Sequence, residues 1–287
     1  MIPAEFDYQA PQTLADAIAL LSRHGDDAKL LAGGHSLIPA MKLRLAQPQL
    51  LVDIGRIKEL SYIRETADRI LIGAMTTHYE IESSASLKES CPLLPECAAH
   101  IGDVQVRNRG TIGGSIAHSD PAGDWPATVL ALRADLVATG PNGERVITAD
   151  DFFIDLFTTA LQPTEILREV RINRLAGKLG QSYKKVRHPA SGFAVVGVAV
   201  SLGLAVDGTC ESAGIGITGV DSKAYRASQV EAALLGHKLD EQTIAAAADH
   251  ACDGIDPNSD LYASADYRRQ LARVYTRRAI KAAASKI

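Results

Sequence analysis

Two glycine-rich segments hold the residue types best suited to binding a ligand. Residues 32–37 read AGGHSL, and residues 107–115 read RNRGTIGGS. Each segment places two adjacent glycines next to serine or threonine hydroxyl groups. Glycine accepts positive φ and lets the main chain approach a ligand closely, so that N–H groups can contact an anion directly. The two segments are therefore candidates for one anion-binding site.

A diphosphate suits such a site, because its charges lie close together and main-chain N–H groups can replace the water that they lose. A helix beginning after residues 32–36 would direct its positive end at the phosphates. Neither segment matches the G-x-G-x-x-G pattern or the P-loop pattern, so a different nucleotide-binding fold is expected. The alternative is that each glycine pair only forms a turn at the end of a strand.

Several polar residues near these segments have two possible roles. Asp124 either caps the helix that follows it, binds a ligand, or does both. His118 is the one obvious acid–base candidate, whereas His35 is expected to offer its main-chain N–H. Arg107 and Arg109 either neutralise phosphate or form structural ion pairs. Trp125 is expected in the core.

The elements that position these segments follow from local patterns. Thr13 and Asp16 predict the start of a helix that ends at Gly25. Alternating and helical apolar spacing then predicts strands and helices along the rest of the chain. Residues 102–123 are predicted to be a long functional loop without its own helices. The predicted domains are residues 1–57, 58–176 and 177–287, the third with three strands followed by helices.

Composition narrows the function classes. The chain has 287 residues and a net charge of -4, which gives no broad attraction to nucleic acid. The four cysteines have neither zinc-site nor cluster-type spacing and are expected to be reduced thiols. No apolar run is long enough to span a membrane, and no signal peptide is visible, so a cytoplasmic location is predicted.

Together the segments AGGHSL and RNRGTIGGS and the pattern DPxxD at residues 120–124 resemble the medium subunit of the aerobic carbon monoxide dehydrogenase type. That subunit belongs to the xanthine dehydrogenase family of molybdenum hydroxylases. The resemblance implies an α+β fold: a two-part FAD-binding domain of the vanillyl-alcohol oxidase and p-cresol methylhydroxylase type, and a smaller α+β C-terminal domain with a three-stranded antiparallel sheet.

The resemblance also implies a division of labour. A large subunit holds molybdopterin and oxidises the substrate, a small subunit holds two [2Fe–2S] clusters, and the medium subunit holds FAD and reduces an external acceptor. Such assemblies are usually dimers of heterotrimers. No residue of this chain is then expected to be catalytic. The FAD-binding residues implied by position are Ala32, Gly33, Gly34, His35, Ser36, Leu37, Ile101, Thr111, Ile112, Gly113, Gly114, Ser115, Asp124, Leu167, Lys185 and Phe193.

Some positions depart from that family pattern. Phe193 stands where this branch commonly has a tyrosine against the flavin ring, Gly192 replaces a usual aspartate, and Ser115 replaces a usual asparagine. Lys185 matches a lysine close to the flavin, where its charge would raise the flavin potential; alternatively it is a solvated strand residue. Two rival functions stay open: a self-contained flavin oxidase or dehydrogenase, and a non-enzymatic nucleotide-binding module.

Overall fold

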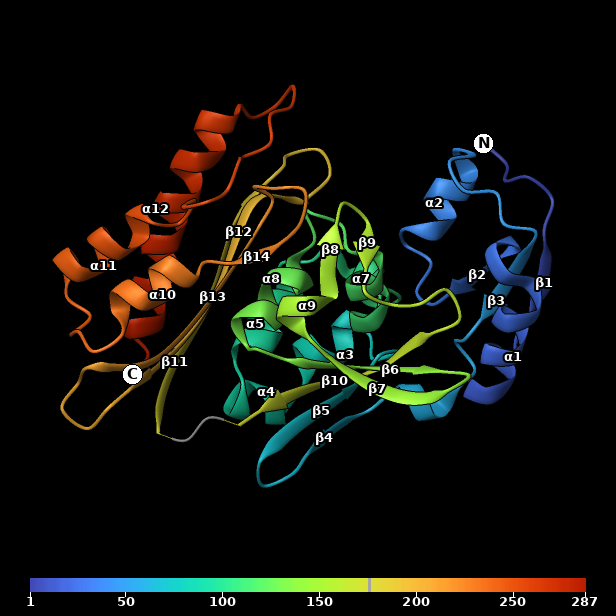
Figure 1. The fold of residues 1–287 in the computed structure, drawn as a ribbon, viewed down its shortest axis with the longest axis horizontal. Coiled ribbons are helices and arrows are strands. Elements are labelled where there is room, and N and C mark those ends of the chain that lie inside the picture. Colours follow the sequence, from blue (N-terminus) through green and yellow to red (C-terminus); the bar gives the residue numbers. More distant parts are fainter. Residues whose placement is uncertain (175–176) are drawn as a thin grey trace.

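The computed structural model describes residues 1–174 and 177–287, which form three units, each built on its own sheet (Figure 1). The first unit contains β1 (Asp7–Gln9), α1 (Leu14–His24), η1 (Gly25–Asp27), β2 (Ala28–Leu31), α2 (Leu37–Lys42) and β3 (Leu50–Asp53). Its sheet has the order β1-β3-β2 with parallel pairs. The short strand β1 is exposed and was not expected from the sequence.

Helix α1 confirms the predicted boundaries. The Thr13 side chain accepts a hydrogen bond from the N–H of Asp16, and Gly25 ends the helix with positive φ. The buried face of the helix packs on the sheet and consists of Leu14, Ala17, Ile18 and Leu21. This packing fixes β2, whose carboxyl end leads directly into the first glycine segment.

The second unit surrounds a five-stranded sheet of order β4-β5-β10-β6-β7, whose pairs are antiparallel. Its elements are η2 (Lys58–Leu60), β4 (Ile63–Glu65), β5 (Arg69–Gly73), α3 (His78–Ser83), α4 (Ala85–Ser90), α5 (Leu93–Ala99), α6 (Val104–Arg107), α7 (Ile112–His118), α8 (Asp124–Ala131), β6 (Asp135–Gly140), β7 (Gly143–Thr148), α9 (Ala149–Phe152), β8 (Phe153–Asp155), β9 (Thr158–Thr159) and β10 (Ile166–Asn173).

One prediction for this unit is wrong. Residues 102–123 are not a plain loop, because α6 and α7 lie within them. The helix α7 begins inside the second glycine segment, with Thr111 as its N-cap. Glycine disfavours helix by about 1 kcal/mol relative to alanine. Packing overrides this preference: a Cβ on Gly113 would lie 2.4 Å from the Cβ of Ala74, so the helix approaches β5 as only glycine permits.

The third unit is an antiparallel sheet of order β11-β12-β13-β14, and its own helices pack on one face of that sheet. Its elements are β11 (Lys178–Arg187), β12 (Ala194–Leu204), β13 (Cys210–Thr218), β14 (Tyr225–Arg226), α10 (Ser228–Leu234), α11 (Glu241–Asp249) and α12 (Ala265–Ala284). The first three strands match the predicted sheet, and the two-residue β14 adds to it. Helix α12 covers the outer face of β11 and β12 (Figure 1).

Helix α8 joins the second unit to the third by close packing on β13. A Cβ on Gly216 would lie 1.9 Å from the carbonyl oxygen of Ala127, and one on Gly214 would lie 2.0 Å from that of Ala131. These glycines alternate along the strand and face α8. The start of α8, where Asp124 lies, is thereby held against the third sheet.

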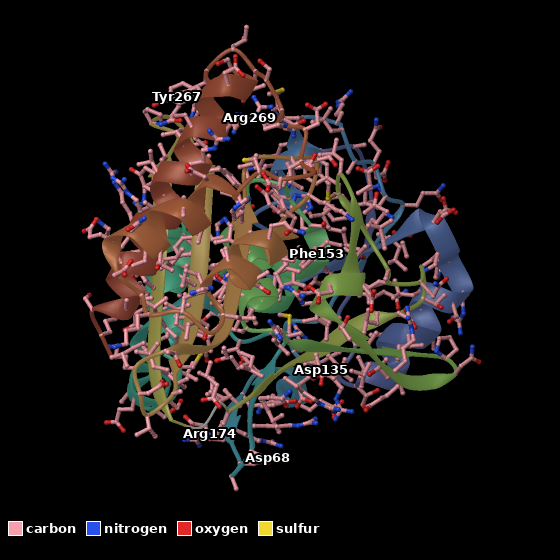
Figure 2. The ribbon with its side chains drawn as sticks, turned by 60° about the vertical axis from the view of Figure 1, so that its left-hand side comes forward. Asp68, Asp135, Phe153, Arg174, Tyr267 and Arg269 are labelled. Carbon is pink, nitrogen blue, oxygen red and sulfur yellow. The ribbon has the colours of Figure 1, made fainter. Side chains whose placement is uncertain are left out.

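The chain leaves the second unit at Arg174, beside the β4–β5 hairpin (Figure 2). The N–H of Arg174 donates to the carbonyl oxygen of Asp68 over 2.8 Å, and its side chain pairs with Glu65. The second predicted domain ends at residue 176. Residues 175–176 lie outside the described residues. In the described part of the chain, no helix is long and apolar enough to cross a membrane.

Candidate functional site

The two glycine segments meet in space although they are far apart in the sequence. A Cβ on Gly33 would lie 2.3 Å from the carbonyl oxygen of Arg109 and 2.8 Å from the Cα of Gly110. A Cβ on Gly114 would lie 3.5 Å from the Cβ of Ala32. The two backbones are therefore in direct contact, and any side chain at position 33 would separate them.

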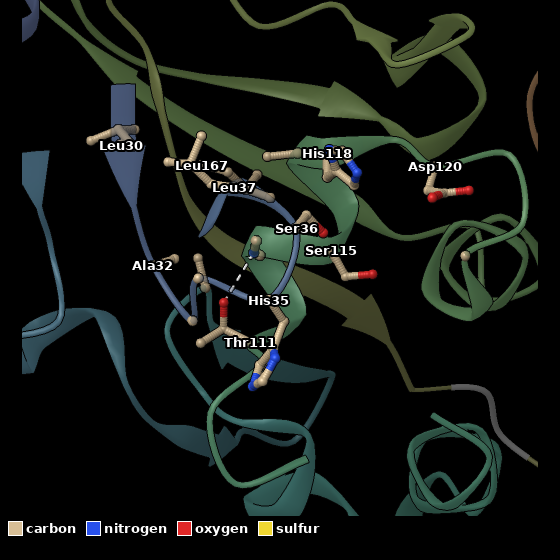
Figure 3. Close-up of a pocket in the computed structure, with 18 of the residues that line it drawn as sticks. Leu30, Ala32, His35, Ser36, Leu37, Thr111, Ser115, His118, Asp120 and Leu167 are labelled. Carbon is tan, nitrogen blue, oxygen red and sulfur yellow. Dashed lines mark hydrogen bonds between the residues drawn. The ribbon is translucent and has the colours of Figure 1, made fainter. Parts of the chain in front are cut away.

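A cavity of about 670 Å³ opens where the segments meet, between the first and second units and the edge of the third. This volume is in the range of cofactor sites. Figure 3 shows labelled residues of both segments around it. The predicted site residues that line it are Ala32, Gly33, Gly34, His35, Ser36, Leu37, Ile101, Thr111, Gly113, Gly114, Ser115, Asp124, Leu167 and Phe193.

The first segment carries free main-chain donors. Among the hydrogen bonds of residues 1–174 and 177–287, none is donated by the N–H groups of residues 33–37. Gly34 has a φ of +77°, a left-handed conformation that glycine adopts without strain. The segment then enters α2, whose N-cap Ser36 makes no capping hydrogen bond with its side chain. Both the N–H groups and the Ser36 hydroxyl are thus available to a ligand.

The second segment uses its main-chain donors within the fold. The N–H of Ile112 donates to Thr76 O over 3.0 Å, and that of Gly113 donates to Ala74 O over 2.8 Å. The N–H of Gly114 donates to Thr111 Oγ1 over 3.1 Å, drawn as the dashed line in Figure 3. The expectation that both segments offer free N–H groups is therefore wrong for residues 112–115. Their contribution to the cavity is close backbone approach and the hydroxyl groups of Thr111 and Ser115.

A buried charge pair forms another wall of the cavity. Asp124 lines the cavity and is 5% exposed. One of its carboxylate oxygens accepts from Tyr183 Oη over 2.5 Å, and the other accepts from Lys185 Nζ over 2.8 Å. Burial raises the pKa of Asp124 above its usual range, and the Lys185 ammonium group opposes that rise. Asp124 does not cap α8, because the N-cap is Gly123.

Lys185 does not line the cavity itself. Its side chain is 1% exposed and lies behind Asp124, so it is not a solvated strand residue. Tyr183 and Lys185 alternate with Lys184 along β11, which turns both of them toward α8. Burial, together with the charge of Asp124, raises the pKa of Tyr183 well above its usual range, so its hydroxyl remains a donor. Tyr183 was not singled out from the sequence, although this alternation was visible there.

His78 is a second cavity residue that sequence reasoning missed. It begins α3 after a capping box formed by Thr77 and Glu80, and its N–H donates to Gly110 O over 2.9 Å. Trp125 Nε1 donates to His78 Nδ1 over 3.0 Å. Burial lowers the pKa of His78 to about 3, with smaller contributions from His35 and Arg107. As expected, Trp125 is fully buried.

The cavity mouth is apolar. Phe193 is 46% exposed and Phe157 is 53% exposed, and both line the cavity. His118 lines it too, with its ring centroid 5.0 Å from that of Phe157. Ile101 and Leu167 give apolar lining farther in. Aromatic and aliphatic walls of this kind suit the faces of a planar ring system.

The remaining predicted residues have structural positions. Ile112 is fully buried and does not line the cavity. Arg107 pairs with Glu82 over 2.6 Å, which fits the structural alternative. Arg109 forms no ion pair with any described residue and lies outside the cavity lining. The four cysteines are free and buried, and no cluster of metal ligands occurs within residues 1–174 and 177–287.

Sequence and structure comparisons agree on the family. Residues 4–174 match the FAD binding domain in molybdopterin dehydrogenase, and residues 181–283 match the CO dehydrogenase flavoprotein C-terminal domain. The carbon monoxide dehydrogenase medium chain of Hydrogenophaga pseudoflava is 43% identical, over 99% of this chain and 98% of that protein. The alpha subunit of the 6-hydroxypseudooxynicotine dehydrogenase complex of Paenarthrobacter nicotinovorans is 38% identical, over 98% and 95%.

A solved structure extends the likeness to three dimensions. The carbon monoxide dehydrogenase of Hydrogenophaga pseudoflava, in a form that lacks the Mo-pyranopterin moiety of its cofactor, contains a chain that matches with a TM-score of 0.96 and 45% identity. The match covers 100% of this chain and 99% of that chain. The chain therefore belongs to the family of FAD-binding flavoprotein subunits of carbon monoxide dehydrogenase and xanthine dehydrogenase type oxidoreductases.

Proposed function

We propose that this chain is the FAD-binding electron-transfer subunit of a molybdenum hydroxylase. In this role it takes electrons from the [2Fe–2S] clusters of a small partner subunit and passes them to an external acceptor. A molybdopterin-binding large subunit oxidises the substrate. The observation that carries the proposal is the meeting of two glycine segments at one cavity, which is lined by residues 33–37, whose N–H groups donate to no described group.

The first segment suits a diphosphate because its donors are main-chain groups held without side-chain motion. An anion gains charge-assisted hydrogen bonds from such groups, and they replace lost hydration. The close contact of Gly33 with Arg109 and Gly110 brings the second segment within reach of the same ligand. We assign the diphosphate and ribityl chain to residues 32–36 and 111–115 together.

Asp124 is assigned to hydroxyl groups of FAD. A carboxylate accepts several hydrogen bonds. Tyr183 donates to one oxygen of Asp124 and Lys185 donates to the other, so each oxygen can accept a further hydrogen bond. The two donors fix the carboxylate in place, so that its remaining acceptor sites point into the cavity. Lys185 acts on the flavin through this pair: its removal leaves a net negative charge beside the cavity, which lowers the potential of a bound flavin.

The apolar residues are assigned to the rings of the cofactor. Phe193 is exposed at the cavity, where its aromatic face would hold a flavin ring, and Ile101 and Leu167 would add apolar contacts. FAD, when bound, supplies redox chemistry that accepts and releases electrons singly or in pairs. The protein binds the cofactor, orients it and tunes its electrostatic surroundings, and no side chain of this chain is needed as nucleophile or general base.

Three further points belong to the proposal. The chain divides into domains at residues 1–57, 58–176 and 177–287, a division supported by the separate sheets. It assembles with its two partner subunits as a dimer of heterotrimers in the cytoplasm. The substrate is decided by the large subunit, and the relatives act on chemically different molecules according to their names, so no substrate is assigned.

Expression of the full chain with and without candidate large and small partner subunits tests the proposal. The purified chain is expected to carry a flavin absorption band, to release FAD on denaturation, and to bind a molybdopterin-containing and a cluster-containing partner. A chain without flavin that retained a bound colourless nucleotide would favour a non-enzymatic module. An FAD-loaded chain that oxidised an organic substrate without partners would contradict the subunit role, and His118 would then be examined as its acid–base group.

A further inference from the structure

His78 is a buried imidazole with only one of its two nitrogens accounted for. Trp125 Nε1–H donates to His78 Nδ1 over 3.0 Å. An indole nitrogen can only donate, so the direction of this bond is fixed. His78 Nδ1 is therefore the acceptor, and the single proton of the neutral ring is on Nε2.

The ring stays neutral for two reasons. His78 is 4% exposed, and its burial disfavours the charged form. Electrostatic interactions with His35 and Arg107 lower the pKa of His78 further. A second proton on Nδ1 would also displace the Trp125 hydrogen bond. The Nε2–H group is thus a fixed, uncharged donor across the physiological pH range.

This donor lies where the two glycine segments meet. A Cβ on Gly110 would lie 2.6 Å from His78 Nε2, so any side chain at position 110 would collide with that nitrogen. Gly33 also packs on Gly110, and both glycines and His78 line the cavity. Within the part of the chain that the structure describes, His78 Nε2 has no hydrogen-bond acceptor. Nε2 of His78 is not one of the fully buried side-chain atoms that lack a partner, so it is open to the cavity, where an acceptor would complete its hydrogen bonding.

We propose that His78 is a binding residue for the cofactor diphosphate, donating its Nε2–H to a phosphate oxygen at the junction of Gly33 and Gly110. This inference rests on the FAD-binding function proposed above and adds a side-chain donor to the main-chain donors of the first segment. Trp125 acts through His78, as a positioning residue that fixes the tautomer. The pair joins α3 and α8, so ligand binding and the start of α8 are physically connected.

The experiment uses the uniformly ¹⁵N-labelled full chain, depleted of flavin. The chain contains one tryptophan, so the indole N–H region of its NMR spectrum holds a single cross-peak, that of Trp125. ADP is the probe, because it carries the diphosphate without a flavin. Addition of ADP is expected to shift both the Trp125 Nε1–H resonance and the His78 Nε2–H resonance. Saturation with ADP without a shift of the His78 resonance would overturn the proposal.

Two variants give the energetic test. His78→Phe keeps an aromatic ring without the donor, and His78→Gln restores an amide that can accept from Trp125 and donate into the cavity. Loss of one neutral hydrogen bond is expected to weaken FAD and ADP binding about tenfold in His78→Phe. His78→Gln is expected to recover most of that affinity. Riboflavin, which lacks phosphate, is expected to bind the wild-type chain and both variants equally.

The outcomes separate this inference from the function on which it rests. A wild-type chain that binds neither FAD nor ADP would contradict the proposed function. A wild-type chain that binds both, with a folded His78→Phe variant of unchanged affinity, would overturn only the role of His78. An equal loss for riboflavin and ADP would also overturn it, since general distortion of the cavity would then explain the change. If His78→Phe does not fold, the resonance shift of the wild-type chain decides.

Discussion

The two glycine segments have similar sequences but different physical roles. In the first, the N–H groups of residues 33–37 donate to no group of the described chain, and Gly34 takes a left-handed conformation. In the second, residues 112–115 form the first turn of α7, and their N–H groups bond to Ala74, Thr76 and the Thr111 cap. The first segment thus offers donors to a ligand, whereas the second uses its donors to fix its own backbone beside the first.

The difference lies in what surrounds each segment. Behind the first segment the chain enters the six-residue helix α2, which contains Pro39, a residue without an N–H to donate. The second segment is anchored by β5, by α3 and by the buried His78–Trp125 pair. A glycine pair therefore predicts close backbone approach, whereas the neighbouring carbonyl oxygens decide whether its N–H groups are free.

The largest expected effect comes from separating the two segments. In Gly33→Val the Cβ alone would lie 2.3 Å from the carbonyl oxygen of Arg109, a main-chain atom that cannot rotate away. We expect loss of bound flavin and a fall of about 3 kcal/mol in the free energy of unfolding. Flavin absorbance per chain and denaturant unfolding measure the two effects. Gly140→Val is the matched control, because its Cβ would meet the side chain of Glu165 instead of a main-chain atom.

Gly114→Val tests the second segment in the same way. Its Cβ would lie 2.8 Å from Thr111 Oγ1, which is closer than van der Waals contact. The N-cap Thr111 would therefore have to move, and Ala32, 3.5 Å from the same Cβ, limits the space for the valine side chain. We expect flavin retention to be lost while the fold survives, with a stability cost of about 2 kcal/mol. Near-ultraviolet circular dichroism checks the fold. A folded variant with normal flavin content would show that the second segment does not shape the site.

His78, which anchors the second segment, should also make the free energy of unfolding depend on pH. The pKa of His78 is about 3 in the folded chain, whereas a histidine in the unfolded chain titrates near 6.5. Between these values the unfolded chain binds more protons, so stability rises with pH and is fully present above 6.5. Below pH 6, we expect the free energy of unfolding of the wild-type chain to fall with decreasing pH more steeply than that of His78→Phe. The difference in slope should approach about 1.4 kcal/mol per pH unit. Parallel curves from urea unfolding at pH 5 to 7 would contradict a neutral buried imidazole.

The smallest expected effects come from two hydroxyl deletions, which distinguish a role in FAD binding from a role in stability. Thr111→Val removes a helix cap and should cost about 1 kcal/mol of stability, with a smaller loss of FAD affinity. Ser36→Ala removes no cap and should leave stability unchanged while FAD affinity falls severalfold. Thermal unfolding of the apo chains and FAD titration provide both measurements. The reverse pattern would exchange the roles assigned to the two segments.

Much of this arrangement was predictable from local pattern. The Thr13 cap, the main strands and the glycine pairs follow from short-range rules, and the family resemblance indicated which residues share a cavity. Three features were not predictable in that way. Helix α7 runs through two glycines because Ala74, the residue directly after β5, packs against it. His78 and Trp125 lie 47 residues apart, and no local pattern links them. Lys185 meets Asp124 only because α8 packs on the third sheet.

The most direct test of the different roles is residue-resolved amide hydrogen exchange by NMR, on the full chain with and without FAD. Free N–H groups exchange quickly, whereas hydrogen-bonded ones are protected. We predict that residues 33–37 exchange quickly in the apo chain and become protected when FAD binds, while residues 112–115 are protected in both states. Protection of residues 33–37 before FAD is added, or no gain there on binding, would contradict the account.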